Sequence, residues 1–215
     1  NELYRPFVVF PVVTQANAEL KNERLEGFEV GFDLMPTEAV SFSLTAFDNR
    51  VKNAIANVTL QPNLRQRQNL PAIDAQGVEA VMRVRTGSIR LDGSLAFTDA
   101  TIDGRDASLA LDGNRPPQTP RWAASATLGW SPKPDWDIAL TLRHVGAQFE
   151  DDQEIDRLES ATTLGVFAQV PLKDRFKIVL RGENLSDERI VTRNAGGAID
   201  LGTPRTIWAG LRYGF

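Results

Sequence analysis

The sequence predicts an all-β protein built from long antiparallel strands, and three observations support this fold class. Apolar residues recur at every second position in nine segments, which is the period of a strand with one apolar face. Short and long connections alternate strictly between these nine segments. No apolar run reaches the roughly 18 residues that a membrane-spanning helix needs.

The composition narrows the classes of function. The 215 residues suit one domain or a large piece of one, with a net charge of −4 and no run of Lys or Arg, so we expect no nucleic-acid partner. The chain has no cysteine and one histidine, His144, so we expect no metal site and no cofactor. With one histidine and no cysteine, the sequence offers no convincing Ser-His-Asp or Cys-His catalytic arrangement, so we do not expect the protein to be an enzyme.

The first four strands follow from alternation before the long connection at 101–120. The first places Phe28, Val30, Phe32 and Leu34 on one face. The second begins at Val40, and we expect it to run on to Leu60, ahead of a polar connection at 61–70. The third and fourth carry apolar residues at alternate positions from Val78 and from Ile89, joined by a Gly-containing turn at 86–88.

The remaining five strands repeat the pattern. They cover 122–130, 136–143, 164–170, 176–181 and 206–215. Short turns are expected near 36–39, 86–88, 131–135 and 172–174, and long connections near 61–70, 101–120, 147–157 and 186–202. Transmembrane barrels have short turns on the periplasmic side and long loops outside, so the alternation favours an antiparallel transmembrane β-barrel.

Strand length and aromatic residues support the membrane interpretation. Most runs reach the roughly 9–11 residues of a tilted transmembrane strand. Trp122 and Trp130 share one face of one strand, about 20 Å apart along the membrane normal at a tilt of about 40°. That spacing suits one aromatic ring at each interface. Trp136 and Tyr213 are further interface candidates, and His144 is expected at the outer interface.

The last strand carries apolar residues at every second position and finishes on an aromatic. Its ending resembles the C-terminal assembly signal of bacterial outer-membrane barrels, for which Leu211, Tyr213 and Phe215 are the candidate residues. We therefore expect outer-membrane lipid and the barrel-assembly machinery as partners. The rival interpretation is a soluble β-sandwich, in which Trp122, Trp130 and Phe215 would be buried in a core.

Charged residues in the predicted loops and on the polar face are the candidate ligand contacts. Arg115, Arg121 and Arg193 stand in or beside outer loops, where guanidinium groups suit the carboxylate or phosphate groups of an anionic ligand. The acidic loop at 150–156 offers oxygen ligands for Ca²⁺, although its spacing matches no EF-hand and a solvated loop is the simpler interpretation. Polar-face residues that would contact a plug inside the lumen or a translocating ligand, or simply be solvated and pair across strands, are Glu29, Asp33, Glu79, Arg83, Arg90, Asp92, Arg143, Lys177, Arg181 and Arg212.

Several motifs are similar to those of TonB-dependent outer-membrane receptors. The segment from Gly202 to Phe215 matches the family's Gly-x-Pro-Arg and Gly-Leu-Arg-Tyr-x-Phe ending, and Glu183-Asn-Leu-Ser-Asp187 resembles its Asn-Leu-Phe-Asp box. Residues 17–23, 29–33 and 77–79 resemble three further patterns in the expected order. The departures are Ala18 and Asn22 where Pro is usual, and Ser186 where Phe is usual.

The resemblance implies a function for the protein and a plug domain that this chain does not contain. The family forms a barrel of about 22 strands plugged by an N-terminal domain. The chain is then expected to be its last nine strands, with 1–21 as outer loop and incomplete strand and the plug absent. The resemblance implies TonB-coupled import of a scarce nutrient, most often a ferric siderophore, across the outer membrane of a Gram-negative bacterium. The alternative is a complete small barrel, porin-like or enzymatic, with residues 3–13 as a tenth strand.

Overall fold

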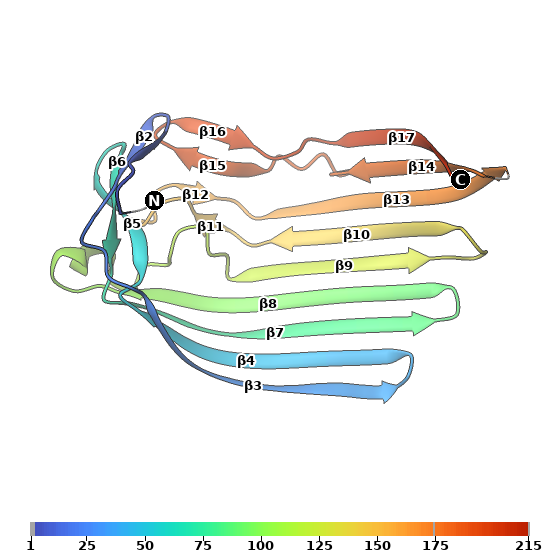
Figure 1. Ribbon diagram of the computed structural model, residues 1–215, viewed down its shortest axis with the longest axis horizontal. Coiled ribbons are helices and arrows are strands. Elements are labelled where there is room, and N and C mark those ends of the chain that lie inside the picture. The colour runs from blue at the N-terminus through green and yellow to red at the C-terminus, as the bar shows by residue number, and fades with distance from the viewer. Residues whose placement is uncertain (1–2, 174, 215) are drawn as a thin grey trace.

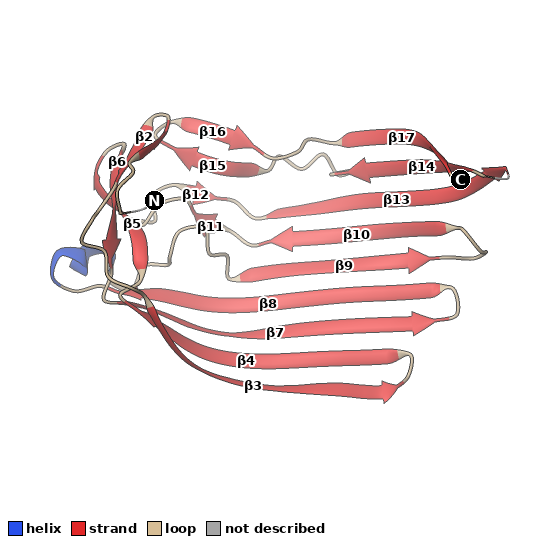
Figure 2. Ribbon diagram, viewed as in Figure 1, coloured by secondary structure: helices blue, strands red, loops and turns tan. Residues whose placement is uncertain are grey.

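The structure is a computed structural model that describes residues 3–173 and 175–214. Its main element is one antiparallel sheet of nine strands, in which neighbours in space follow the chain order (Figures 1 and 2). This arrangement confirms the predicted fold class and the nine strands. They are β3 (Arg24–Thr37), β4 (Val40–Lys52), β7 (Ala72–Thr86), β8 (Ile89–Asp103), β9 (Trp122–Trp130), β10 (Asp137–Val145), β13 (Ala161–Lys173), β14 (Phe176–Glu183) and β17 (Thr206–Tyr213).

The two ends of the sheet differ in their connections. Residues 38–39, 87–88 and 131–136 join consecutive strands at one end, which we call the turn end. The long connections all lie at the other end, which we call the loop end (Figure 1). The predicted alternation of short and long connections is therefore present in the structure.

The loop end carries its own secondary structure. A four-stranded sheet has the order β1-β2-β6-β5 and includes one parallel pair, β2 with β6. Two hairpins and a short 3₁₀ helix complete the layer (Figure 2). The elements are β1 (Phe7–Val9), β2 (Val12–Gln15), β5 (Ile55–Gln61), β6 (Leu64–Asn69), η1 (Asp106–Leu111), β11 (Gln148–Phe149), β12 (Arg157–Leu158), β15 (Val191–Ala195) and β16 (Ala198–Leu201).

Three sequence expectations differ from the structure here. The second strand does not continue to Leu60, because Asn53 adopts a positive φ of 52° and the chain turns into β5. The polar segment at 61–70 is largely strand, since β6 pairs with β5 from Leu64 to Asn69. The third strand begins at Ala72, not near Val78, so β4 and β7 stay paired as far as Lys52 and Ala72.

The two faces of the nine-stranded sheet have opposite chemistry. One, the apolar face, carries large exposed hydrophobic side chains such as Phe32, Val78, Leu95, Leu128 and Leu142. The other, the polar face, carries hydroxyl and charged groups at the alternate positions of the same strands. On it a Cβ at Gly77 would lie 2.2 Å from the carbonyl oxygen of Phe97 and 2.6 Å from the ring of Phe47, so this strand position needs glycine.

Most of the buried apolar residues lie at the loop end. Val58, Leu70, Ile102 and Leu111 form one cluster, with Leu70 only 1% exposed. These residues come from β5, the β6–β7 junction, β8 and η1, so the cluster fixes the loop layer onto the ends of the long strands. No helix in the described part of the chain is long and apolar enough to cross a membrane.

Candidate functional site

The apolar face ends in a boundary that runs in register across β4, β7 and β8. Val30, Ala46, Val78, Phe97 and Trp122 form one row of paired residues. Two pairs closer to the loop end, the row on the same face contains Asp48, Gln76 and Asp99, while β3 still carries the exposed Phe28 beside Asp48. Charged groups are costly in lipid, so the change from apolar to charged side chains marks the outer edge of a lipid-facing belt.

The four predicted interface aromatics lie at or directly beside the ends of strands. Trp122 begins β9 and packs against Phe97 in a tilted arrangement with ring centroids 4.7 Å apart, while Trp130 ends β9 at the turn end. Trp136 lies directly before β10, with the Lys133 ammonium 6.0 Å from its ring centroid. Tyr213 ends β17 and contacts Phe176 at 4.9 Å.

The residues of the candidate assembly signal are partly described. Leu211 pairs with Ile178 and Tyr213 with Phe176, so both lie on the apolar face of the final strand. Phe215 lies outside the described residues. His144, the other interface candidate, shares a 2.8 Å hydrogen bond through its Nδ1 with the Thr162 hydroxyl at the loop end of β10.

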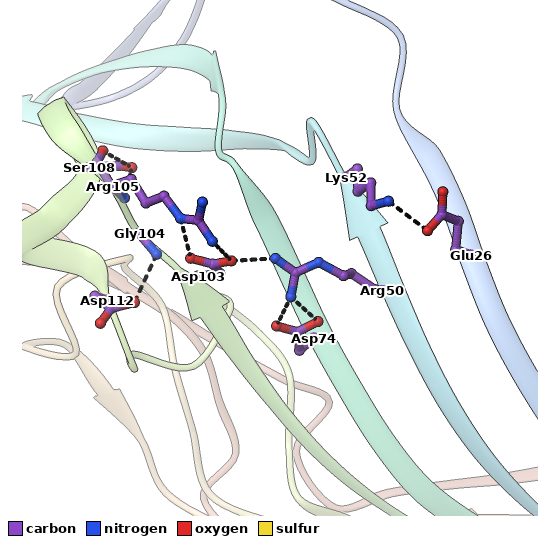
Figure 3. Close-up of polar contacts among 9 residues, drawn as sticks. All are labelled: Glu26, Arg50, Lys52, Asp74, Asp103, Gly104, Arg105, Ser108 and Asp112. Atoms are coloured by element: carbon purple, nitrogen blue, oxygen red, sulfur yellow. Dashed lines mark hydrogen bonds and ion pairs between the residues drawn. The ribbon is translucent and has the colours of Figure 1, made fainter.

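A charged network stands on the same face beyond the apolar belt (Figure 3). The Arg50 guanidinium donates to both carboxylate oxygens of Asp74, at 2.8 and 2.6 Å, and also pairs with Asp103. Arg105, which directly precedes η1, pairs with Asp103 at 3.1 Å, and Lys52 pairs with Glu26 at 2.6 Å. These pairs link β3, β4, β7 and β8 where lipid gives way to water.

The two C-terminal motifs contact each other in the long connection between β14 and β17. Asn184 is 5% exposed, and its amide donates to the backbone oxygens of Glu188 and Thr203. The Arg205 guanidinium pairs with Asp187 at 3.1 Å. The Asn-Leu-Ser-Asp and Gly-Thr-Pro-Arg segments therefore hold this connection together, which gives both motifs a structural role.

The structure does not bring the three candidate arginines together. Arg115 pairs with Glu154 at 3.3 Å and lies over the Phe149 ring. Arg121 pairs with Asp99 at 3.0 Å, beside the outer edge of the apolar belt. Arg193 pairs with Asp200 at 3.5 Å and donates to the backbone oxygens of Val9 and Phe10.

Among these arginines, Arg193 lines a pocket among the loops. The pocket holds about 480 Å³ and is bounded by β1, β2, β5 and the loops before β9 and after β11. Arg193 and Arg65 contribute positive charge to its lining, and Glu150, Asp151 and Asp152 contribute negative charge. Apolar side chains fill much of the rest, a combination that is usual in small-molecule sites. They are Phe7, Val9, Val12, Ile55 and Ile73, with Pro116 and Pro117.

The acidic loop is an internal scaffold. Asp151 accepts backbone N–H bonds from Gln153, Ile155 and Asp156. Asp152 is 1% exposed and accepts from the backbone N–H of Thr59 at 2.9 Å. Hydrogen bonds from several backbone N–H groups order the loop around these two side chains. Among the described residues no group of three His, Cys, Asp or Glu side chains is placed to hold a metal ion.

One carboxyl of this loop has an altered acidity. Burial raises the pKa of Asp156 above its ordinary value of 3.8, and the negative charge of Asp151 raises it further. The Arg65 guanidinium acts in the opposite direction. Sequence reasoning did not single out Arg65, because it stands in a polar segment whose pairing with β2 and β5 leaves no periodic signal.

The fold agrees with the comparisons with known proteins. Residues 1–185 match the family model described as "TonB dependent receptor-like, beta-barrel". The chain therefore belongs to the β-barrel of the TonB-dependent receptors, which are outer-membrane proteins of Gram-negative bacteria. This finding confirms the resemblance drawn from the motifs and excludes the soluble sandwich.

Individual proteins that resemble this chain share only 16–26% of its residues in the three examples below. The chain is 26% identical over 207 residues to the "Ferrioxamine receptor" of Yersinia enterocolitica, covering 91% of this chain and 28% of that protein. In fold it is similar to the ferric yersiniabactin uptake receptor FyuA of Yersinia pestis, with TM-score 0.73, 21% identity, and coverage of 90% and 30%. It is also similar to the siderophore receptor PiuA of Acinetobacter baumannii, with TM-score 0.72, 16% identity, and coverage of 88% and 28%. The chain thus spans less than a third of these proteins.

Proposed function

We propose that this chain is part of a receptor that imports a ferric siderophore, with energy supplied through TonB. The observation that carries the proposal is the similarity along 91% of the chain to a protein named as a ferrioxamine receptor. The pocket among the loops supports it, because about 480 Å³ suits a small-molecule ligand. Arg193 is the predicted arginine that we retain as a ligand contact, since it lines this pocket.

Uptake of labelled iron tests this function. A siderophore-deficient strain would carry the receptor that contains this chain as its sole uptake receptor, and would be given ⁵⁵Fe-ferrioxamine. We expect uptake that disappears when TonB is deleted. Uptake that is independent of TonB would contradict the mechanism. Absence of uptake for ferrioxamine and for a catecholate and a citrate chelate would contradict the siderophore class.

We further propose that the chain forms the last nine strands of a larger barrel, with the TonB-contacting plug in another part of the protein. Strands β3 and β17 form the two edges of the nine-stranded sheet. An edge strand offers unpaired backbone groups that lipid does not satisfy. Residues 1–215 refolded alone in detergent are expected to associate or aggregate, as followed by size-exclusion chromatography with light scattering. A monodisperse monomer would overturn the fragment proposal.

A further inference from the structure

We propose that a hollow on the apolar face of the nine-stranded sheet seats one acyl chain of a phosphorylated membrane lipid, whose phosphate contacts Arg121. The hollow extends across β4, β7, β8 and β9. It opens toward lipid, so it is separate from the pocket among the loops and from the lumen. The proposal goes beyond import and holds for any transported solute.

A small residue between larger ones creates the hollow. Ala80 on β7 pairs with Leu44 on β4 and with Leu95 on β8, so its methyl group forms a floor between two longer side chains. The hollow holds about 320 Å³ and has an apolar lining. A trapped water molecule needs polar partners, which this lining does not offer, so an apolar group is the suitable occupant. The lining residues are Leu44, Val78, Ala80, Leu95, Phe97 and Trp122.

Two aromatic rings close the hollow on the side of the loop end. Phe97 and Trp122 are paired residues of β8 and β9, with ring centroids 4.7 Å apart. The outer edge of the lipid-facing belt follows directly, because Asp99 is the next residue of β8 on this face. Tryptophan prefers the level at which acyl chains meet their headgroups. The hollow therefore begins where an acyl chain leaves its headgroup.

Arg121 stands at this end of the hollow, because it directly precedes Trp122. Its guanidinium lies 3.0 Å from an oxygen of Asp99, and its side chain is 53% exposed. Within the described residues the guanidinium donates no hydrogen bond, and the contacted oxygen of Asp99 accepts none. A guanidinium has five N–H donors and forms strong charge-assisted hydrogen bonds with phosphate. Arg121 can therefore bind a lipid phosphate while it keeps its ion pair.

The neighbouring charges leave Arg121 as the phosphate contact. Arg50 and Arg105 already donate hydrogen bonds to Asp103 (Figure 3). Asp48 would repel a phosphate, but it lies on β4, three strands away from Arg121. At about 4.8 Å per strand the separation is roughly 14 Å. This exceeds the Debye length of about 8 Å at physiological ionic strength, so the repulsion is largely screened.

The rest of the proposed barrel does not fill this hollow. A plug would occupy the lumen, which is on the opposite face of the sheet. Additional strands would pair with the edge strands β3 and β17, and β4, β7, β8 and β9 lie between those edges. The apolar face around the hollow carries half-exposed side chains such as Leu95 and Leu128, as expected where lipid is the neighbour.

Two lipids that differ only in their phosphate test the proposal. Dioleoylphosphatidic acid and dioleoylglycerol would be titrated into the detergent-purified receptor that contains this chain, with bound lipid counted by native mass spectrometry. We expect the receptor to retain one phosphatidic acid with about 10-fold higher affinity than dioleoylglycerol, because only the former contacts Arg121. Ala80→Phe fills the hollow and should weaken binding of both lipids about 10-fold or more, since acyl methylenes lose their contacts.

Arg121→Gln separates the phosphate contact from the hollow. We expect it to remove the preference for phosphatidic acid and to leave the affinity for dioleoylglycerol unchanged. The matched control is Ala168→Phe. Ala168 is a partly buried alanine that pairs with Ile138 on the same face and does not line the hollow. This control should change the binding of neither lipid.

Four outcomes would overturn the proposal. Two concern the wild-type receptor, namely no retention of either lipid or equal affinity for both. The third is an equal loss of binding in Ala80→Phe and Ala168→Phe. The fourth is a receptor dimer that Ala80→Phe converts to monomers while lipid binding is unchanged, which would assign the hollow to a second barrel. Lipid retention is measured without transport, so its outcome is independent of ⁵⁵Fe uptake.

Discussion

The nine-stranded sheet, which forms the barrel wall, and the loop end differ in where their large apolar side chains lie. In the wall, large apolar side chains such as Leu95 and Leu128 stay about half exposed on one face, because lipid is their solvent. At the loop end, Leu70 and Ile102 are almost fully buried, as in a water-soluble domain. The boundary between the two regimes lies at the row from Val30 to Trp122. The apolar side chains of the wall are therefore stabilised by contact with lipid, and those of the loop end by burial against other parts of the protein.

The largest effect is expected from the buried cluster. Leu70→Ala removes a side chain that packs with Val58, Ile102 and Leu111 and should cost about 2–5 kcal/mol of loop-layer stability. Leu128→Ala on the lipid-facing surface is the control, and we expect a much smaller cost because no protein cavity forms. Hydrogen exchange of the loop amides measures the difference. Equal effects of the two substitutions would show that the regions share one kind of core.

Arginine substitutions at two adjacent positions of β8 distinguish the lipid-facing side of the sheet from the polar side by their cost in stability. Leu95→Arg puts a cation into the lipid belt and should cost about 2 kcal/mol, since lipid-facing arginine costs ~2–4 kcal/mol at the midplane and less near an interface. Ser94→Arg points to the polar face, and we expect little change. Urea unfolding in lipid vesicles measures both. A larger penalty for Ser94→Arg would reverse the assignment of the faces.

The acidic loop offers a smaller test. Asp152→Asn weakens the hydrogen bonds that this side chain accepts from the Thr59 backbone and hydroxyl, with an expected cost of about 1–3 kcal/mol to the local structure. Proteolysis of the loop should accelerate while the barrel remains folded. Glu159→Gln, at an exposed position in the same connection, is the control and should leave cleavage unchanged.

The smallest effect concerns pH. The raised pKa of Asp156 means that the fold favours its protonated form. The stabilisation from protonation is fully present below the ordinary value of 3.8 and is lost as the pH rises through the higher folded value. Asp156→Asn should therefore stabilise the loop slightly at neutral pH and reduce its pH dependence. Exchange rates of the 150–158 amides, corrected for intrinsic pH effects, measure this. A destabilised loop at neutral pH would contradict the sign.

The wall was predictable because lipid imposes period-2 alternation on every strand. The runs from Phe28 to Leu34 and from Ile207 to Tyr213 each carry that signal without help from tertiary contacts. The turn end was predictable for the same reason, since the alternation stops at Gly- and Pro-containing segments.

The loop end was less predictable because its strands are solvated on both sides or packed irregularly. Strand β6 reads Leu64-Arg-Gln-Arg-Gln-Asn69, which has no apolar face, and it exists through pairing with β2 and β5. The candidate arginines were found by residue type, but their partners depend on which loops meet. Arg193, for example, contacts Val9 and Phe10 from the opposite end of the sequence.

The measurement that tests the account most directly is a spin-label scan along β8 of the receptor in lipid vesicles, from position 89 to 103. We predict that labels at 89, 91, 95 and 97 collide with oxygen dissolved in the lipid, while labels at 90, 92 and 94 do not. At 99, 101 and 103 the label should become accessible to a water-soluble relaxation agent, which places the boundary beside Phe97 and Trp122. Uniform accessibility to the water-soluble agent along the strand, or a boundary elsewhere, would contradict the lipid-facing wall.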